Sequence, residues 1–391
     1  MICNRRSAFS FQRSASSDQP EEFKVQSSKF RVSTFRRFDV STFLPGLCSL
    51  LVTLGLSGGS PARADEIATR SEHYRKIKII DYSSGRIHFR QPAGDLADVS
   101  VLDVRALLVD TVGAVSDLNQ AEVYVDKGQS AQAVLRYERA LLSTQGFWQE
   151  LVRVRLLQAC DQAGYFDKAM THWLALLKLD AGMAAELLPG SIPSTRTQAV
   201  SRALSDIEAA SAKTLDENAR RLIDLLRYSV YRRLGDDATD ELAGRIVLSP
   251  LSGPLATVRA YAIKTDALRR VFQNQRTRQV LAGLDAALED CPAASLPDLL
   301  LLKGEVLYAT AQEREDYLHS GLAFMRVPVH FPGDPRAARA LLWAARVHEK
   351  IDAPEKAAEL LRECLAVASA DAETRAAATE LLNRLTERLG S

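Results

Sequence analysis

The chain has few cysteines and almost no net charge, and both shortages exclude classes of protein. Its 391 residues include five cysteines, and 50 Lys and Arg residues face 49 Asp and Glu residues, for a net charge of +1. The three cysteines after residue 64 are Cys160, Cys291 and Cys364, an odd and widely spaced set that does not make a disulfide framework. A nearly neutral chain also lacks the positive field that attracts nucleic acid.

The short motifs of well-known catalytic and metal sites are missing as well. The sequence contains no His-Glu-x-x-His, no Gly-rich phosphate loop, no Gly-x-Ser-x-Gly and no Cys-x-x-Cys. Its six histidines stand singly along the chain. We therefore expect no catalytic residue, no metal site and no cofactor. Cys160 and Cys364 are expected to be buried thiols. If the protein is exported, Cys291, beside Pro292, is expected to be a free thiol or one that pairs with another molecule.

The longest apolar run, residues 43–56, is too short for a membrane span. It has 14 residues, whereas a hydrocarbon core takes about 20. An arginine pair precedes it and the sequence Ala-Arg-Ala follows, ending at Ala64, as in a secretory signal peptide. We expect a disordered leader at 1–64, cleavage after Ala64 and export to the periplasm or cell envelope; a buried helix or an uncleaved anchor is the alternative. The long basic stretch before the run suggests that translation starts near residue 30.

Residues 65–110 predict a small strand-rich cap. Runs of β-branched and alternating residues at 74–80, 86–90 and 98–102 are separated by turn clusters, which indicates a three-stranded meander. A helix starting near Val104 is expected to cover it, because three strands are marginal alone. One aromatic residue, Phe89, is too little for a nucleic-acid stacking platform. The basic residues are therefore interpreted as a solvated face: Lys76, Lys78, Arg86, His88 and Arg90.

Two windows that lie 36 residues apart carry the same pattern. Counted from Gly128 and from Gly164, a small residue follows five positions later, an aromatic residue nine later and a leucine thirteen later. Such a period indicates helix–turn–helix repeats, which bury their apolar faces only by stacking on neighbours. The two sets are Tyr124, Gly128, Ala133, Tyr137, Ala140 and Leu141, then Cys160, Gly164, Ala169, Trp173, Leu176 and Leu177.

The order of these residues resembles the tetratricopeptide (TPR) repeat family. The resemblance implies a mostly α fold, an α-solenoid of antiparallel helix hairpins over 111–391, and a role in binding proteins. Similar spacing returns at Ala357, Leu361 and Cys364, with Asp352 at the place of the turn glycine. The expected helices are 104–127, 130–144, 148–163, 165–180, 195–211, 215–234, 237–248, 254–272, 277–290, 296–312, 315–327, 334–350, 354–369 and 371–388.

In TPR arrays the first helix of each hairpin lines an inner groove, and the resemblance assigns groove positions here. The first half of the groove is expected to be acidic to neutral and the second half basic, which would orient a bound peptide. The Lys and Asn with which some family members clamp a C-terminal carboxylate are absent. The candidates are Glu122, Asp126, Gln158, Asp161, Gln162, Arg232, Arg233, Arg346 and Lys350.

Leader and repeats together predict an exported, non-catalytic scaffold or adaptor that binds a protein or peptide. No nucleic-acid partner is expected, and no membrane span is expected once the leader is removed. Two alternatives remain open. One is a cytoplasmic TPR regulatory module whose basic cap, residues 74–109, touches nucleic acid, and the other is a helical accessory domain of an envelope enzyme.

Overall fold

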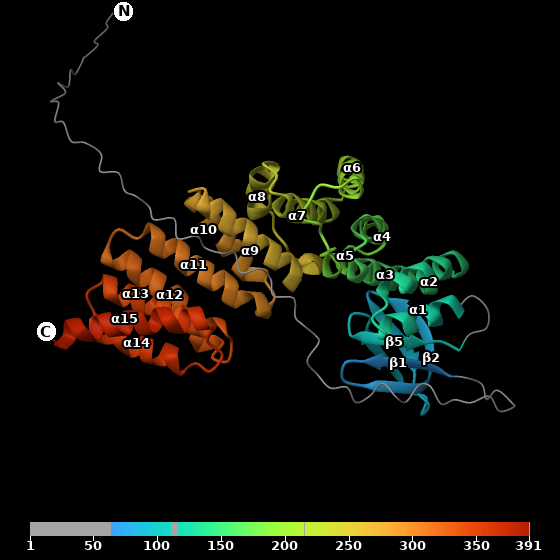
Figure 1. Ribbon diagram of the computed structural model, residues 1–391, viewed down its shortest axis with the longest axis horizontal. Helices are drawn as coiled ribbons and strands as arrows, with labels where there is room; N and C mark the ends of the chain where they lie inside the picture. Colours follow the sequence, from blue (N-terminus) through green and yellow to red (C-terminus); the bar gives the residue numbers. More distant parts are fainter. Residues whose placement is uncertain (1–63, 111–115, 215, 391) are drawn as a thin grey trace, which may run out of the picture. The chain divides into compact units, whose positions relative to one another are not determined.

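The structure is a computed structural model that describes residues 64–110, 116–214 and 216–390 (Figure 1). A small antiparallel β-sheet comes first, and helices follow it to the end of the described chain. The predicted fold class, mostly α with antiparallel helix hairpins behind a small β unit, is confirmed for this part of the chain. The leader expected before Ala64, including the apolar run 43–56, lies outside the described residues.

The sheet has five strands where the sequence predicted three. Its order is β4-β3-β2-β1-β5, and every neighbouring pair is antiparallel. Residues 104–108, expected to begin a helix, form a strand instead, because they pair with residues 65–69, an equally unpredicted strand. The strands are β1 (Asp65–Thr69), β2 (His73–Ser83), β3 (Arg86–Arg90), β4 (Leu96–Ser100) and β5 (Val104–Leu108).

Side chains alternate between the two faces of the sheet, as the two-residue period of a strand requires. Ile77 and Ile79 on β2 and Phe89 on β3 are buried. The intervening Lys78 and the flanking Arg90 are exposed, as expected of a solvated face. The helix α1 (Ser116–Asp126) packs on β5, and α3 (Phe147–Ala163) packs on β2.

The helices form hairpins that are joined by short turns. The pairs α1/α2, α3/α4, α7/α8, α9/α10, α11/α12 and α13/α14 each pack together, and α15 packs on α14. The remaining bounds are α2 (Ser130–Ser143), α4 (Phe166–Leu179), α5 (Ala181–Glu186), α6 (Gln198–Lys213), α7 (Glu217–Leu234), α8 (Ala238–Leu248), α9 (Val258–Gln273), α10 (Thr277–Asp290), α11 (Leu296–Thr310), α12 (Arg314–His330), α13 (Arg336–Lys350), α14 (Pro354–Ala366) and α15 (Ala372–Gly390).

The residues that define the repeat occupy the hairpin cores. Ala133 and Tyr137 on α2, and Ala169 and Trp173 on α4, are fully buried. The turn residues take left-handed backbone, with φ of 75° at Gly164 and 59° at Asp352. The sequence placed Asp352 where the pattern has glycine, and its positive φ confirms that position, since short polar side chains tolerate this conformation.

Small residues lie where packed helices come closest to one another. A Cβ added to Gly304 on α11 would lie 2.5 Å from a ring carbon of Phe324 on α12, which is closer than atoms pack. One added to Gly283 on α10 would lie 2.7 Å from the carbonyl oxygen of Val247 on α8. Side-chain size at these positions therefore sets how closely the helices approach.

Residues 181–197 break the regular alternation of helices. The short helix α5 is tied to α4 because the indole Nε1 of Trp173 donates to the Ala184 carbonyl at 2.8 Å. Residues 188–197 then run without helix to α6. Within the described residues, no helix combines the length and apolar character that crossing a bilayer requires.

Candidate interaction surface

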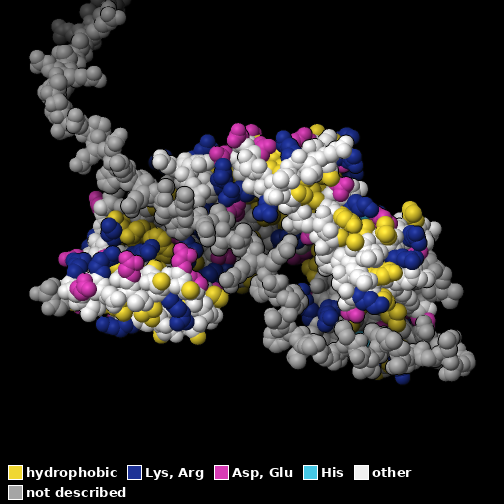
Figure 2. All heavy atoms as spheres, viewed as in Figure 1, with side chains coloured by type: hydrophobic (Ala, Val, Ile, Leu, Met, Phe, Trp, Pro, Cys, Tyr) yellow, Lys and Arg dark blue, Asp and Glu magenta, His cyan; other side chains and the backbone are white. Residues whose placement is uncertain are grey.

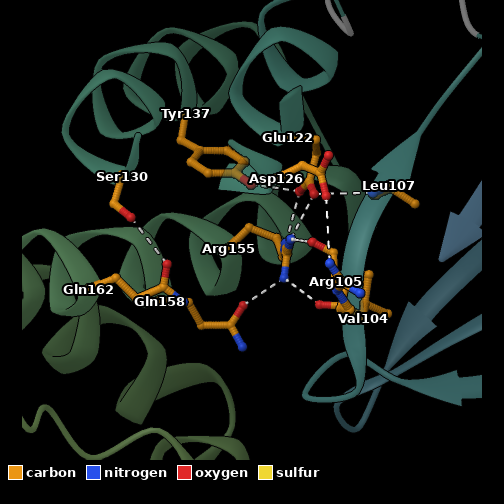
Figure 3. A network of polar contacts seen from close by, with 10 residues as sticks. All are labelled: Val104, Arg105, Leu107, Glu122, Asp126, Ser130, Tyr137, Arg155, Gln158 and Gln162. Carbon is orange, nitrogen blue, oxygen red and sulfur yellow. Dashed lines mark hydrogen bonds and ion pairs between the residues drawn. The ribbon is translucent and has the colours of Figure 1, made fainter. Parts of the chain in front are cut away.

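The groove candidate Glu122 is buried inside the molecule instead of facing a partner. Its side chain is 2% exposed and sits between α2, α3 and β5 (Figure 3). One carboxylate oxygen accepts from the Tyr137 hydroxyl at 2.6 Å, and the other accepts from the Leu107 backbone N–H at 3.1 Å. The Arg155 guanidinium donates to both oxygens, at 2.8 and 2.6 Å. Glu122 is therefore a structural residue that joins sheet and helices.

Arg155 extends the same network to the sheet. Its side chain is 5% exposed, and its guanidinium donates to the carbonyls of Val104 and Arg105 at 3.0 and 3.2 Å. Burial disfavours the charged guanidinium, but the Glu122 carboxylate outweighs that effect and raises the pKa of Arg155. Burial and the same carboxylate raise the pKa of Tyr137 well above its usual value. The network thus consists of one ion pair and a neutral phenol donor.

The other candidates of the first half also contact groups within the chain. Gln158 accepts from Arg155 at 3.0 Å, and Gln162 accepts from the Ser130 hydroxyl at 3.3 Å. Asp126 lies 3.9 Å from the guanidinium of Arg105. The carboxylate of Asp161 accepts two backbone N–H groups at 2.8 Å and so anchors the segment after α5; the donors are Gly190 and Ser191.

The second half presents a different surface, built on the first helices of three successive hairpins. Glu305 on α11 accepts from Arg269 on α9 and from Arg339 on α13, both at 2.7 Å. The carboxylate is 10% exposed, whereas the two arginine side chains are 36% and 42% exposed. Two guanidinium groups therefore share one carboxylate and keep part of their surface in water.

Aromatic rings continue this surface along α11 and α13. Tyr308 lies one turn beyond Glu305, and its ring packs edge to face on Trp343, with centroids 5.3 Å apart. The guanidinium of Arg346 lies 4.6 Å from the Trp343 ring centroid, within the range of a cation–π contact. We call this surface the α9–α13 face; it comprises Arg269, Glu305, Tyr308, Arg339, Trp343 and Arg346.

The second-half candidates meet this face to different degrees. Arg346 belongs to it, and Lys350 is exposed one turn further along α13. Arg232 on α7 lies 3.5 Å from the carboxylate of Asp266 on α9, which precedes Arg269 by one turn. Arg233 is exposed beside Arg232. The spatial continuity of these positions stays a prediction for Arg233 and Lys350, for which no contact across helices is seen.

Sequence reasoning missed most of the α9–α13 face. Arg339, Trp343 and Arg346 are spaced four and three residues apart, which places them on one side of a helix, and this signal was visible in the sequence. The partners on α9 and α11, Arg269 and Glu305, could not be identified in the same way. Arg269 lies 36 residues before Glu305, and Arg339 lies 34 residues after it. Only the packing of the hairpins brings them together.

Charge is mixed over the side of the molecule that Figure 2 shows. Figure 2 shows cationic, anionic and hydrophobic side chains interspersed over the visible side, without a large area of one charge sign. Among the described residues, no group of three or more His, Cys, Asp or Glu side chains is arranged to hold a metal ion. The α9–α13 face instead offers guanidinium groups and aromatic rings, which bind carboxylates and planar groups.

Comparison with known proteins adds little to these observations. No family profile matches the chain, and no sequence among the curated proteins matches it. Among solved structures, the crystal structure of the P58(IPK) TPR domain is similar, with 14% identity, 70% of this chain and 79% of that chain covered, and a TM-score of 0.26. The TPR-like description therefore rests on the hairpins themselves, their turn residues and their buried repeat positions.

Proposed function

We propose that this protein is a non-catalytic scaffold that binds a protein partner on the α9–α13 face. One observation carries the proposal. Three guanidinium groups and two partly exposed aromatic rings lie along this face: Arg269 and Arg339 share the Glu305 carboxylate, and Arg346 and Tyr308 contact Trp343. Arginine, tyrosine and tryptophan are the residues that most often dominate protein–protein binding energies. Of the first-half candidates, Glu122 is buried, and the other four contact groups of the same chain.

The leader predicted from the sequence indicates the compartment in which the protein works. The arginine pair, the apolar run 43–56 and the Ala-Arg-Ala sequence ending at Ala64 support export to the periplasm or cell envelope. An adaptor there would bring its partner to other envelope proteins without chemistry of its own. A fusion of residues 1–100 to alkaline phosphatase tests this, because that enzyme is active only outside the cytoplasm. Activity is expected, and an inactive but stable fusion would favour the cytoplasmic module.

Affinity capture tests the binding role. Tagged full-length protein is incubated with envelope extract, and the retained proteins are compared with those retained by the triple variant R269A/R339A/R346A, which removes the three cations of the face. We expect at least one protein to be lost with the variant. The matched control is R278A/K356A/R362A, which removes three exposed cations from the second helices α10 and α14. Retention that is unchanged by either variant, or lost equally with both, would contradict the proposal.

A further inference from the structure

We infer that the α9–α13 face recognises an acidic, extended protein segment, and that Glu305 is an internal stand-in for that segment's carboxylates. The inference rests on the proposed function and specifies the chemistry of the partner. Glu305 already shows the preferred ligand, since a carboxylate lies between Arg269 and Arg339 at 2.7 Å from each. A carboxylate supplied by a partner would meet the same two donors.

The charge balance of the face leaves room for further anions. Arg269, Arg339 and Arg346 carry three positive charges, and Glu305 carries one negative charge. Within the described residues, no carboxylate lies within ion-pair distance of Arg346, whose observed contact is the Trp343 ring. Each guanidinium has five N–H donors, and those of Arg269 and Arg339 each use one on Glu305. Unused donors on exposed side chains favour an acidic ligand.

The spacing along α13 suits an extended segment. Arg339 and Arg346 are seven residues apart, a rise of about 10 Å along a helix. A polyproline-type extended chain advances about 9 Å in three residues and returns its side chains to the same side. Acidic residues three positions apart would therefore reach both arginines. The ring of Trp343, between them, would lie beneath the intervening residues.

Nucleic acid fits the same face less well. A phosphate backbone carries a charge at every residue and is attracted by continuous positive surface. Here Glu305 lies at the centre, and Asp266 on α9 precedes Arg269 by one turn. Fixed carboxylates at both places would repel evenly spaced phosphates, whereas a peptide can place neutral residues opposite them.

Fluorescence anisotropy with the full-length protein tests the inference. The probe is a labelled peptide of four Glu-Ser-Ser units, and its neutral match has four Gln-Ser-Ser units. We expect the Glu peptide to bind at least tenfold more tightly than the Gln peptide, with weaker binding at higher salt. The variant R269A/R339A should lose about tenfold in affinity, since charged hydrogen bonds are removed. The control R278A/R362A should leave the affinity unchanged.

The variant E305Q gives the sharpest outcome. Removing the internal carboxylate frees both guanidinium groups, so the Glu peptide should bind about threefold to tenfold more tightly. If the contacts of Glu305 with Arg269 and Arg339 only hold α9, α11 and α13 together, E305Q will lower the melting temperature without tightening peptide binding, and the inference is overturned. Thermal melts of each variant confirm that it is folded. Equal binding of Glu and Gln peptides, or tighter binding of a twelve-nucleotide single strand, would also overturn it.

These results separate the two proposals. If capture of an envelope protein depends on Arg269, Arg339 and Arg346 but the Glu peptide does not bind, the acidic segment is wrong and the scaffold role stands. If neither the peptide binds nor capture depends on those residues, the α9–α13 face is not a binding surface.

Discussion

The guanidinium of Arg155 and the carboxylate of Glu122 form a buried ion pair, with N···O distances of 2.8 and 2.6 Å, that joins α1 and α3 to β5. Every group of this pair has hydrogen-bond partners, which offsets the cost of removing two charges from water. The pair also explains why α1 carries an acidic residue, Glu122, at a buried position next to Ala121.

Removing one member of this pair should be strongly destabilising. R155M leaves the Glu122 carboxylate buried without its cation, and the free energy of unfolding is expected to fall by about 3–5 kcal/mol. Urea unfolding followed by circular dichroism measures the change. R136M is the control, because the Arg136–Asp117 pair is about one-third exposed and should contribute less than about 1 kcal/mol. Equal losses in the two variants would contradict the structural role assigned to Arg155.

Enlarging Gly304 should separate α11 from α12. The added methyl group of G304A would meet the Phe324 ring at 2.5 Å, and overpacking of this kind costs about 1–3 kcal/mol. The better helix propensity of alanine returns at most about 1 kcal/mol. Melting temperature reports the balance, with G333A as control, because nothing lies within 4 Å of a Cβ there. A G304A protein as stable as the wild type would show that the hairpin adjusts freely.

Lys264 should make stability depend on pH. It is 1% exposed, its ammonium donates to the Ser249 carbonyl at 2.7 Å, and burial together with Arg221 lowers its pKa to about 8. In the unfolded chain the pKa is near 10.4, so between pH 8 and 10 the unfolded state binds more protons and this group makes folding more favourable as pH rises.

The comparison with K264M isolates that effect from buried tyrosines and thiols, which titrate in both proteins. Between pH 7.5 and pH 10 the unfolding free energy of the wild type should rise by about 2 kcal/mol relative to K264M. Urea unfolding at the two pH values measures the difference. A constant difference would mean that Lys264 is charged in the folded protein throughout.

Thiol labelling should distinguish Cys291 from the other two described cysteines. Burial raises the pKa of Cys160 to about 12 and that of Cys364 to about 11, and both are fully buried. Cys291 is only half-buried, although burial raises its pKa as well. At pH 8 iodoacetamide should modify Cys291 first, with Cys160 and Cys364 reacting after denaturation, as peptide mass spectrometry would show. Early labelling of Cys160 would indicate local opening of the α3/α4 hairpin.

The sequence predicted what depends on local pattern. The buried positions of the repeat, the turns at Gly164 and Asp352 and three of the five strands could all be read from spacing. The strand Val104–Leu108 could not, because its apolar residues also suit a helix and only pairing with Asp65–Thr69 decides between the two. Local pattern fails where the deciding partner lies far along the chain.

The same limit applies to the candidate site. The nine predicted groove residues came from helix positions alone, which cannot show that Glu122 is buried. Glu122 is buried because β5 supplies the Leu107 N–H and α3 supplies Arg155. Glu305 was missed because its partners come from α9 and α13, more than thirty residues away on either side.

The side chains that meet β5 also determine where the sheet can be extended. Arg155 donates to the carbonyls of Val104 and Arg105. Glu122 accepts from the N–H of Leu107, and the Asn119 amide bonds both the N–H and the carbonyl of Val109. An outer strand with several backbone groups already hydrogen-bonded to side chains offers fewer free groups for pairing with another molecule. Strand exchange or edge-to-edge aggregation is therefore disfavoured at β5, and β4, the other outer strand, is the edge where an additional strand would join more readily.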